Sequence, residues 1–113
     1  MRIQIKEQDD IQLLNIEGTV DVRTAPLLRG EFEKLLKAGA RKVILNLSGV
    51  ELLSSSGASN LVRLAGELDE AGGTLVLSSP SQRCKYVLDL LELPDFFHLF
   101  ESDEAALGFF KGS

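Results

Sequence analysis

The strongest constraint on this chain is a strand–helix–strand pattern in its middle. Residues 42–47 (KVILNL) form a short, dense apolar run, typical of a strand buried on both faces. Apolar residues then recur at helical spacing after Ser55, and a second dense run follows at residues 74–77 (TLVL). Two strands joined by a helix pair in parallel through a right-handed crossover. The pattern therefore predicts an α/β fold with parallel strands at the centre of a sheet.

The first twenty residues predict an antiparallel hairpin at one side of that sheet. Ile3 and Ile5 alternate with polar residues, and residues 11–16 form a second apolar strand that ends at Gly18. Residues 8–10 (QDD) lie between the two strands and are typical of a tight turn. Because strands this close in sequence pair antiparallel, the sheet is expected to be mixed.

Capping and helix-breaking residues set the expected limits of four helices. Thr24 is expected to cap the first helix, with Pro26 in its first turn and Gly39 at its end. The third helix is expected to reach Leu91, with that side chain facing inward. A loop is expected at 48–54 and an edge strand at 97–100. The second helix is expected to run from 55 to Gly72-Gly73, the third to start at 79–81, and the last to run from Ser102 to near Phe110. The predicted architecture is one mixed sheet, with an N-terminal hairpin, parallel strands beside it and helices packed on it.

Length and composition favour one soluble domain over residues 1–113, long enough to bury a core without disulfides. Cys84 is the only cysteine, so no disulfide can form within the chain. No apolar run approaches the roughly 20 residues needed to cross a membrane, and the N-terminus lacks a hydrophobic signal core. We therefore expect a cytoplasmic protein with no membrane insertion. A net charge of −5 disfavours nucleic acid as a direct partner, because such a surface repels phosphate backbones.

Three serines stand where a strand gives way to a helix. Ser54, Ser55 and Ser56 precede Gly57, shortly after the apolar run at 42–47. Open α/β sheets place their working groups beyond the carboxyl ends of strands, and a helix start offers unpaired N–H groups and a partial positive charge. A phosphate added here would accept hydrogen bonds from those N–H groups. Serine is also a preferred helix cap, and three serines without other context are more often only that.

Two further motifs add to the serine motif. Residues 18–25 (GTVDVRTA) look like a Gly-x-Leu-Asp-x-x-Thr-Ala segment, and residues 43–50 (VILNLSGV) are similar to an apolar strand followed by Asn/Asp-Leu-Ser-x-Val. Residues 54–57 (SSSG) match an Asp-Ser-[Ser/Thr/Ala]-Gly phosphorylation motif, with Ser54 in the place of the aspartate. These three motifs, in this order, resemble the STAS domain, a family named for sulfate transporters and anti-sigma factor antagonists. The resemblance covers nearly the whole chain.

The resemblance implies an anti-sigma factor antagonist that regulates sigma-dependent transcription. Such a protein binds an anti-sigma factor, usually a serine kinase, while it is unphosphorylated, and phosphorylation by the kinase breaks that contact. The implied acceptor is Ser55, with Ser54 and Ser56 as alternatives, and a phosphatase is a further expected partner. The implied partner-binding residues are Asp21, Thr24, Ser54, Ser56, Gly57 and Ser59.

Other interpretations remain beside this one. Because Ser54 replaces the aspartate of the motif, the chain is alternatively an unphosphorylated interaction subunit of an ABC-type lipid transporter or of a signalling scaffold. An enzyme is not expected, since the sequence has neither a Gly-x-Ser-x-Gly elbow nor a phosphate-binding loop. His98, the only histidine, is expected to be packed or on the surface. No cofactor and no metal are expected, because zinc sites need clustered Cys and His.

Overall fold

The computed structural model describes residues 1–112, which contain a five-stranded sheet with strand order β1-β2-β3-β4-β5. The strands are β1 (Arg2–Gln8), β2 (Ile11–Val20), β3 (Lys42–Leu53), β4 (Thr74–Ser78) and β5 (His98–Phe100). β1 runs antiparallel to β2, and every other neighbouring pair is parallel. The helices are α1 (Ala25–Lys37), α2 (Ser55–Glu70), α3 (Gln82–Leu90) and α4 (Asp103–Phe110). The predicted α/β fold with one mixed sheet is confirmed.

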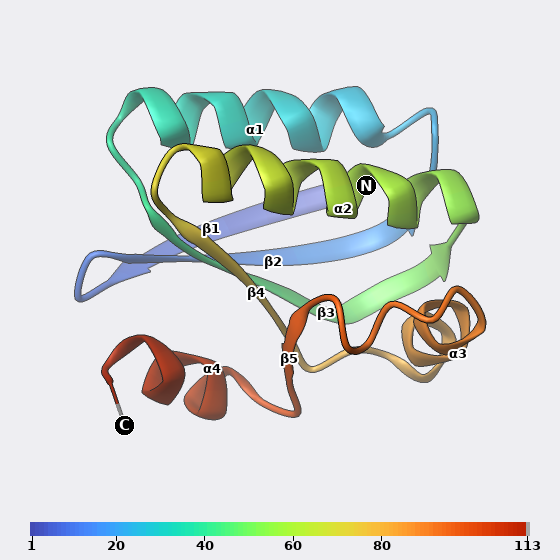
Figure 1. Cartoon of the computed structure of the whole chain (residues 1–113). Helices are drawn as coiled ribbons and strands as arrows, with labels where there is room; N and C mark the ends of the chain where they lie inside the picture. The colour runs from blue at the N-terminus through green and yellow to red at the C-terminus, as the bar shows by residue number, and fades with distance from the viewer. Residues whose placement is uncertain (113) are drawn as a thin grey trace.

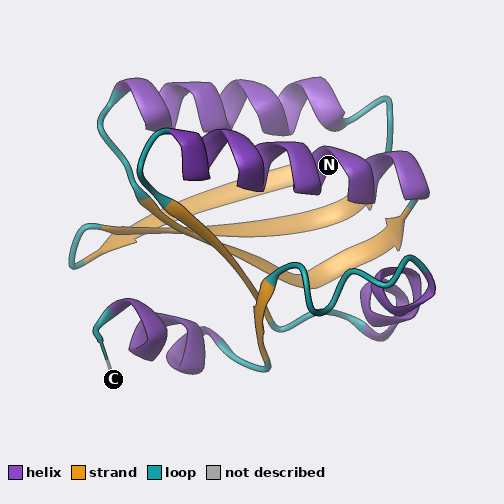
Figure 2. Ribbon diagram, viewed as in Figure 1, coloured by secondary structure: helices purple, strands orange, loops and turns teal. Residues whose placement is uncertain are grey.

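The helices cover the two faces of the sheet unequally (Figures 1 and 2). α1 and α2 lie side by side over one face, whereas α4 lies on the opposite face near the C-terminus. The larger core lies under α1 and α2 and includes the buried Leu45, Leu61 and Leu64. A smaller cluster on the α4 side is built around Ile44 and Val76. Because β3 and β4 are covered on both faces, their sequences read as continuous apolar runs.

The β1–β2 hairpin turns at Asp9 and Asp10. Both residues have positive φ, 51° and 64°, as a type I′ turn requires. Aspartate visits this left-handed conformation more readily than most residues with a Cβ, because its short side chain bonds locally. The turn predicted at residues 8–10 is confirmed.

The expected loop at residues 48–54 is wrong, because β3 continues to Leu53. β2 likewise continues beyond Gly18, so that its last residue, Val20, is still paired with β3. The pairing of β2 with β3 is irregular at two places, where its register shifts between residues 15 and 17 and between residues 18 and 19. Serine and glycine favour a loop locally, but pairing with a neighbouring strand overrides that preference.

Leu91 does not face inward as expected. α3 ends at Leu90, and Leu91 occupies the C-cap position with 38% of its surface exposed. Glu92 follows with a positive φ of 57°, which turns the chain away from the helix axis. The inward face of α3 is formed by the fully buried Cys84 and Leu88.

The other helix ends agree with the sequence. Gly39 and Gly72 follow α1 and α2 with φ values of 93° and 87°, the conformation in which glycine commonly ends a helix. Ser102 caps α4, since its hydroxyl accepts a hydrogen bond of 3.1 Å from the backbone N–H of Ala105. Backbone freedom at the glycines and side-chain capping at Ser102 therefore explain these limits.

Candidate functional site

The loop after β2 and the start of α2 meet at the carboxyl edge of the sheet (Figure 1). Val20 and Leu53, the last residues of β2 and β3, are partners in the parallel register. The backbone N–H of Ser54 donates a hydrogen bond of 3.0 Å to the carbonyl oxygen of Val20. The structure thus brings loop 21–24 beside the three serines. We call the surface formed by residues 21–24 and 54–59 the serine edge.

Ser54 is the N-cap of α2. Its Oγ accepts a hydrogen bond of 3.0 Å from the backbone N–H of Gly57, and it lies 3.0 Å from the hydroxyl of Ser56. Serine and aspartate are comparably good caps. Ser54 therefore keeps the capping role that an aspartate would fill at this position, but it supplies no negative charge.

Ser55 differs from both neighbouring serines. Its side chain is exposed at the first position of α2, and within residues 1–112 its hydroxyl has no hydrogen-bond partner. Ser56 is also exposed, but its hydroxyl is shared with Ser54. The first turn of a helix leaves N–H groups unpaired and carries a partial positive charge. An anion attached to Ser55 would therefore lie in a favourable electrostatic environment.

Gly57 and Ser59 continue the serine edge along α2. Gly57 is buried, and a Cβ at this position would overlap the carbonyl oxygen of Val20. This glycine is required by packing and offers no side chain to a partner. Ser59 is exposed, and its spacing of four residues from Ser55 puts both side chains on the same side of the helix.

Asp21 and Thr24 brace loop 21–24 by exchanging hydrogen bonds. The Thr24 hydroxyl accepts from the backbone N–H of Asp21 at 3.0 Å and donates to the carbonyl oxygen of Thr19 at 2.9 Å. Asp21 Oδ1 accepts from the backbone N–H groups of Arg23 and Thr24 at 2.9 and 3.1 Å. Thr24 occupies the N-cap position of α1, but its side chain makes no capping hydrogen bond. The expected cap is wrong, because this hydroxyl is committed to the loop.

The Asp21 carboxylate is stabilised in its charged form. Its side chain is 13% exposed, and its Oδ2 lies 3.3 Å from the guanidinium of Arg23. Desolvation acts to raise the pKa of Asp21, but hydrogen bonds from Thr24 and Arg23 and the charge of Arg23 together lower this pKa below its ordinary value. Loop 21–24 therefore presents a fixed carboxylate whose charge is balanced by an exposed arginine.

A groove that the sequence did not predict lies next to the serine edge. It measures about 360 Å³ and lies between the end of β3 and the first turns of α3. We call it the α3 groove; its lining residues are Leu52, Leu53, Gln82, Arg83, Tyr86 and Val87. In the sequence, the spacing of four residues between Tyr86 and Leu90 indicates an apolar side of α3. Helical spacing alone does not say whether the core or solvent lies against that side.

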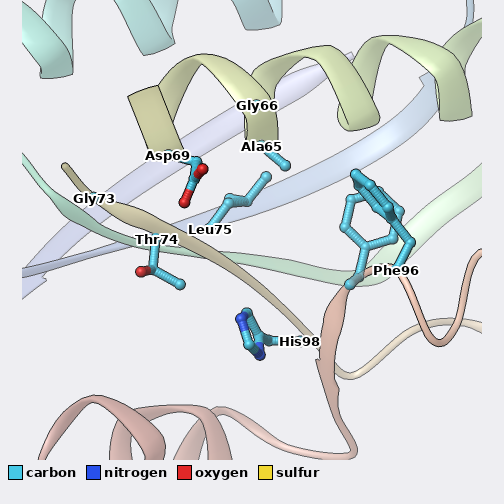
Figure 3. Close-up of a pocket in the computed structure, with 9 residues that line it drawn as sticks. Ala65, Gly66, Asp69, Gly73, Thr74, Leu75, Phe96 and His98 are labelled. Atoms are coloured by element: carbon cyan, nitrogen blue, oxygen red, sulfur yellow. The ribbon is translucent and has the colours of Figure 1, made fainter. Parts of the chain in front are cut away.

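A second cavity, of about 280 Å³, lies at the other end of α2 (Figure 3). The second half of α2, the start of β4 and residues 96–98 line it, with Asp69 and His98 as its titratable groups. The exposed His98 imidazole packs against the ring of Phe109, with 4.7 Å between ring centroids. This cavity contains none of the predicted site residues.

Within residues 1–112, no three His, Cys, Asp or Glu side chains gather closely enough to hold a metal ion. Cys84 is buried in α3, and desolvation raises the pKa of its thiol against the opposing hydrogen bonds from Ser81. In the same part of the chain, no helix combines the length and the apolar character needed to span a membrane.

The mixed sheet, its helices and the serine motif at the start of α2 define a STAS domain. The family model for this domain matches residues 2–106, and the chain belongs to the STAS domain family. One curated relative is the anti-sigma-B factor antagonist of Bacillus subtilis, which is 27% identical over 107 residues, or 95% of this chain and 97% of the relative. The predicted resemblance to anti-sigma factor antagonists of this family is confirmed.

Solved structures agree with this assignment of the fold. TM1081 of Thermotoga maritima matches with a TM-score of 0.86 and 25% identity, covering 94% of this chain and 92% of that one. The anti-sigma factor antagonist SpoIIAA of Bacillus, in its unphosphorylated form, matches with a TM-score of 0.82 and 19% identity over 99% of this chain and 98% of its own. At that identity the match to SpoIIAA concerns the fold alone.

Proposed function

We propose that this chain is an anti-sigma factor antagonist that docks through the serine edge onto an anti-sigma factor with serine kinase activity and is released when that kinase phosphorylates Ser55. The proposal depends chiefly on one observation: Ser55 has an exposed hydroxyl with no hydrogen bond to any of residues 1–112, next to two serines whose hydroxyls are engaged. The names of the curated relatives support the general role. This role acts on transcription in the cytoplasm and requires no catalysis by the chain itself.

The physical basis of release is a change of charge on a docking surface. A phosphate on Ser55 adds about −1.5 to −2 charges at neutral pH. Loop 21–24 is nearly neutral, because Arg23 balances Asp21, so the added charge dominates the serine edge. A partner fitted to the neutral surface would have to desolvate this dianion on docking. The core is left unchanged, because the Ser55 side chain is exposed.

Ser54 and Ser56 are less suited as acceptors. The Oγ of Ser54 is engaged with Gly57 and Ser56, and its side chain is only partly exposed, so it is less open to a kinase than that of Ser55. The hydroxyl of Ser56 is held by Ser54. We assign Asp21, Thr24, Ser54, Ser56 and Ser59 to the docking surface. Gly57 supports that surface by its packing, and a phosphatase would return the protein to its binding form.

A second candidate function keeps the docking surface and omits phosphorylation. The observation that favours it is Ser54, which leaves Ser55 without the neighbouring carboxylate of the family motif. In this case the chain would be the interaction subunit of an ABC-type lipid transporter or of a signalling scaffold. Recovery of a transporter ATPase, and of no sigma regulator, in a pull-down with the full chain would favour this candidate.

The test is a phosphorylation and binding experiment with purified candidate anti-sigma serine kinases. The wild-type chain, Ser55→Ala and Ser55→Asp are titrated against each kinase by calorimetry, and phosphate is located by mass spectrometry after incubation with ATP. We expect wild type and Ser55→Ala to bind, and Ser55→Asp to bind at least about tenfold more weakly.

The control for the acceptor is Ser48→Ala, which removes an exposed hydroxyl of β3 outside the serine edge. This variant should still be phosphorylated, whereas Ser55→Ala should not. Phosphate on a residue other than Ser55, or equal affinity of wild type and Ser55→Asp, would remove Ser55 from the mechanism.

A further inference from the structure

The α3 groove and the last turn of α3 beside it expose apolar side chains that the fold leaves uncovered. Leu52 is 46% exposed, and Tyr86 and Leu90 are each 67% exposed. Arg83, Tyr86 and Leu90 follow one another at spacings of three and four residues, so they form one ridge along α3. Exposed apolar surface gathered beside a groove is typical of an interaction site.

The groove also has a distinct charge. Arg83 is exposed and is the only charged residue among those that line it. Within residues 1–112, no carboxylate forms an ion pair with Arg83. An occupant that brings one carboxylate against Arg83 would therefore complement the groove, while a basic segment would be repelled.

The position of the groove links it to the serine edge. Leu52 and Leu53 line the groove, and Ser54 follows them directly in the chain. On the other side, the hydroxyl of Ser81, the N-cap of α3, donates a hydrogen bond of 2.9 Å to the carbonyl oxygen of Val50 in β3. This bond fixes the first turn of α3 against the end of β3. One partner is therefore able to cover both surfaces in a single docked position.

We propose that the α3 groove is the second contact of the partner that docks on the serine edge, and that it receives an amphipathic helix of that partner. The apolar side of the helix covers Leu52, Tyr86 and Leu90, and one of its carboxylates pairs with Arg83. A ridge of side chains along α3 beside a groove is the shape against which a second helix packs. This inference rests on the proposed function, because it concerns the same anti-sigma partner.

The experiment uses the full chain and the anti-sigma serine kinase that binds it in the test above. Arg83→Glu and Tyr86→Ala are titrated against the kinase at low and at high salt. The control is Lys37→Glu, which reverses an exposed charge at the far end of α1. None of the three side chains is buried, so all three variants should fold like wild type. Their melting temperatures check this.

We expect Arg83→Glu and Tyr86→Ala each to weaken binding by about tenfold, and Lys37→Glu to bind like wild type. The effect of Arg83→Glu should shrink at high salt, because screening weakens an ion pair, whereas that of Tyr86→Ala should persist.

If both variants bind like Lys37→Glu while Ser55→Asp does not bind, the groove is not a contact and the proposed function stands. If no kinase binds the wild-type chain, both proposals fail together. A self-association that Tyr86→Ala abolishes, with unchanged affinity for the kinase, would assign the groove to a second copy and overturn the inference.

Discussion

Gly57, in the first turn of α2, packs directly on the backbone of Val20 at the end of β2. The same Val20 carbonyl accepts the backbone N–H of Ser54. Two contacts therefore hold the start of α2 against β2, and they fix where the backbone of Ser55 lies. The position of the proposed acceptor is a consequence of close backbone packing.

Gly57→Ala should destabilise the protein by about 1–3 kcal/mol, because the added methyl group overlaps the Val20 carbonyl and forces α2 away from β2. Gly66→Ala is the matched control in the same helix. A Cβ at Gly66 meets nothing within 4 Å, so this change should stabilise the protein by up to about 1 kcal/mol. Urea denaturation measures both values. Equal stabilities of the two variants would contradict the close approach of Gly57 to Val20.

Ser54→Ala should lower the free energy of unfolding by about 1 kcal/mol, because the N–H of Gly57 loses its acceptor. Ser54→Asp should remain within a few tenths of a kcal/mol of wild type, since aspartate caps as well as serine. Ser55→Ala should leave stability unchanged, as the Ser55 hydroxyl is unbonded within residues 1–112. The free energies of unfolding of the three variants, measured by heat or urea, distinguish the capping role of Ser54 from the proposed acceptor role of Ser55. A larger loss for Ser55→Ala than for Ser54→Ala would reverse these roles.

The contribution of Asp21 to stability should depend on pH in the acid range. Because its folded pKa is lowered, the contribution is complete above the ordinary aspartate pKa of about 3.9 and is lost as the pH falls through the lower folded value. Asp21→Asn should therefore be less stable than wild type at neutral pH, and the difference should shrink below about pH 4. Melting temperatures of both proteins across this range provide the measurement. A difference that stays constant with pH would show that the charge of Asp21 does not stabilise loop 21–24.

The Cys84 thiol should be almost unreactive in the folded protein. Its burial raises the pKa, so little thiolate forms near neutral pH, and the reagent has no access to the sulfur. Modification by a disulfide reagent should be at least about a hundredfold slower in buffer than in denaturing urea, because it requires opening of α3. Equal rates in the two conditions would mean that α3 is not stably packed.

Much of the fold could be predicted because its signals are local. The dense runs at 42–47 and 74–77 mark strands buried on both faces, and Asp9 and Asp10 mark the turn of the hairpin. Helix caps such as Ser102 act within one turn of the residue that supplies them. These features depend on neighbours a few positions away, so they can be read in order along the chain.

Other features depended on contacts between distant segments. Residues 48–53 extend β3 because β2 lies alongside them, although their serine and glycine favour a loop. The Thr24 hydroxyl bonds to Thr19 and Asp21 and does not cap α1. Leu91, at the C-cap of α3, stays 38% exposed, so the core does not reach this end of the helix. Pairing, a competing hydrogen bond or the limit of the core overrode a local preference in these three places.

The sequence by itself determined the class of fold and the place of the serine motif, because hydrophobic period and capping chemistry act along the chain. Only the tertiary structure decided that, among residues 1–112, the hydroxyl of Ser55 has no partner while those of Ser54 and Ser56 are engaged, and that Leu52 and Tyr86 share one groove. Both outcomes depend on which atoms of β2, β3 and α3 approach one another when the core closes. Hydrophobic burial sets that approach, and the hydrogen bonds at the serine edge then follow from it.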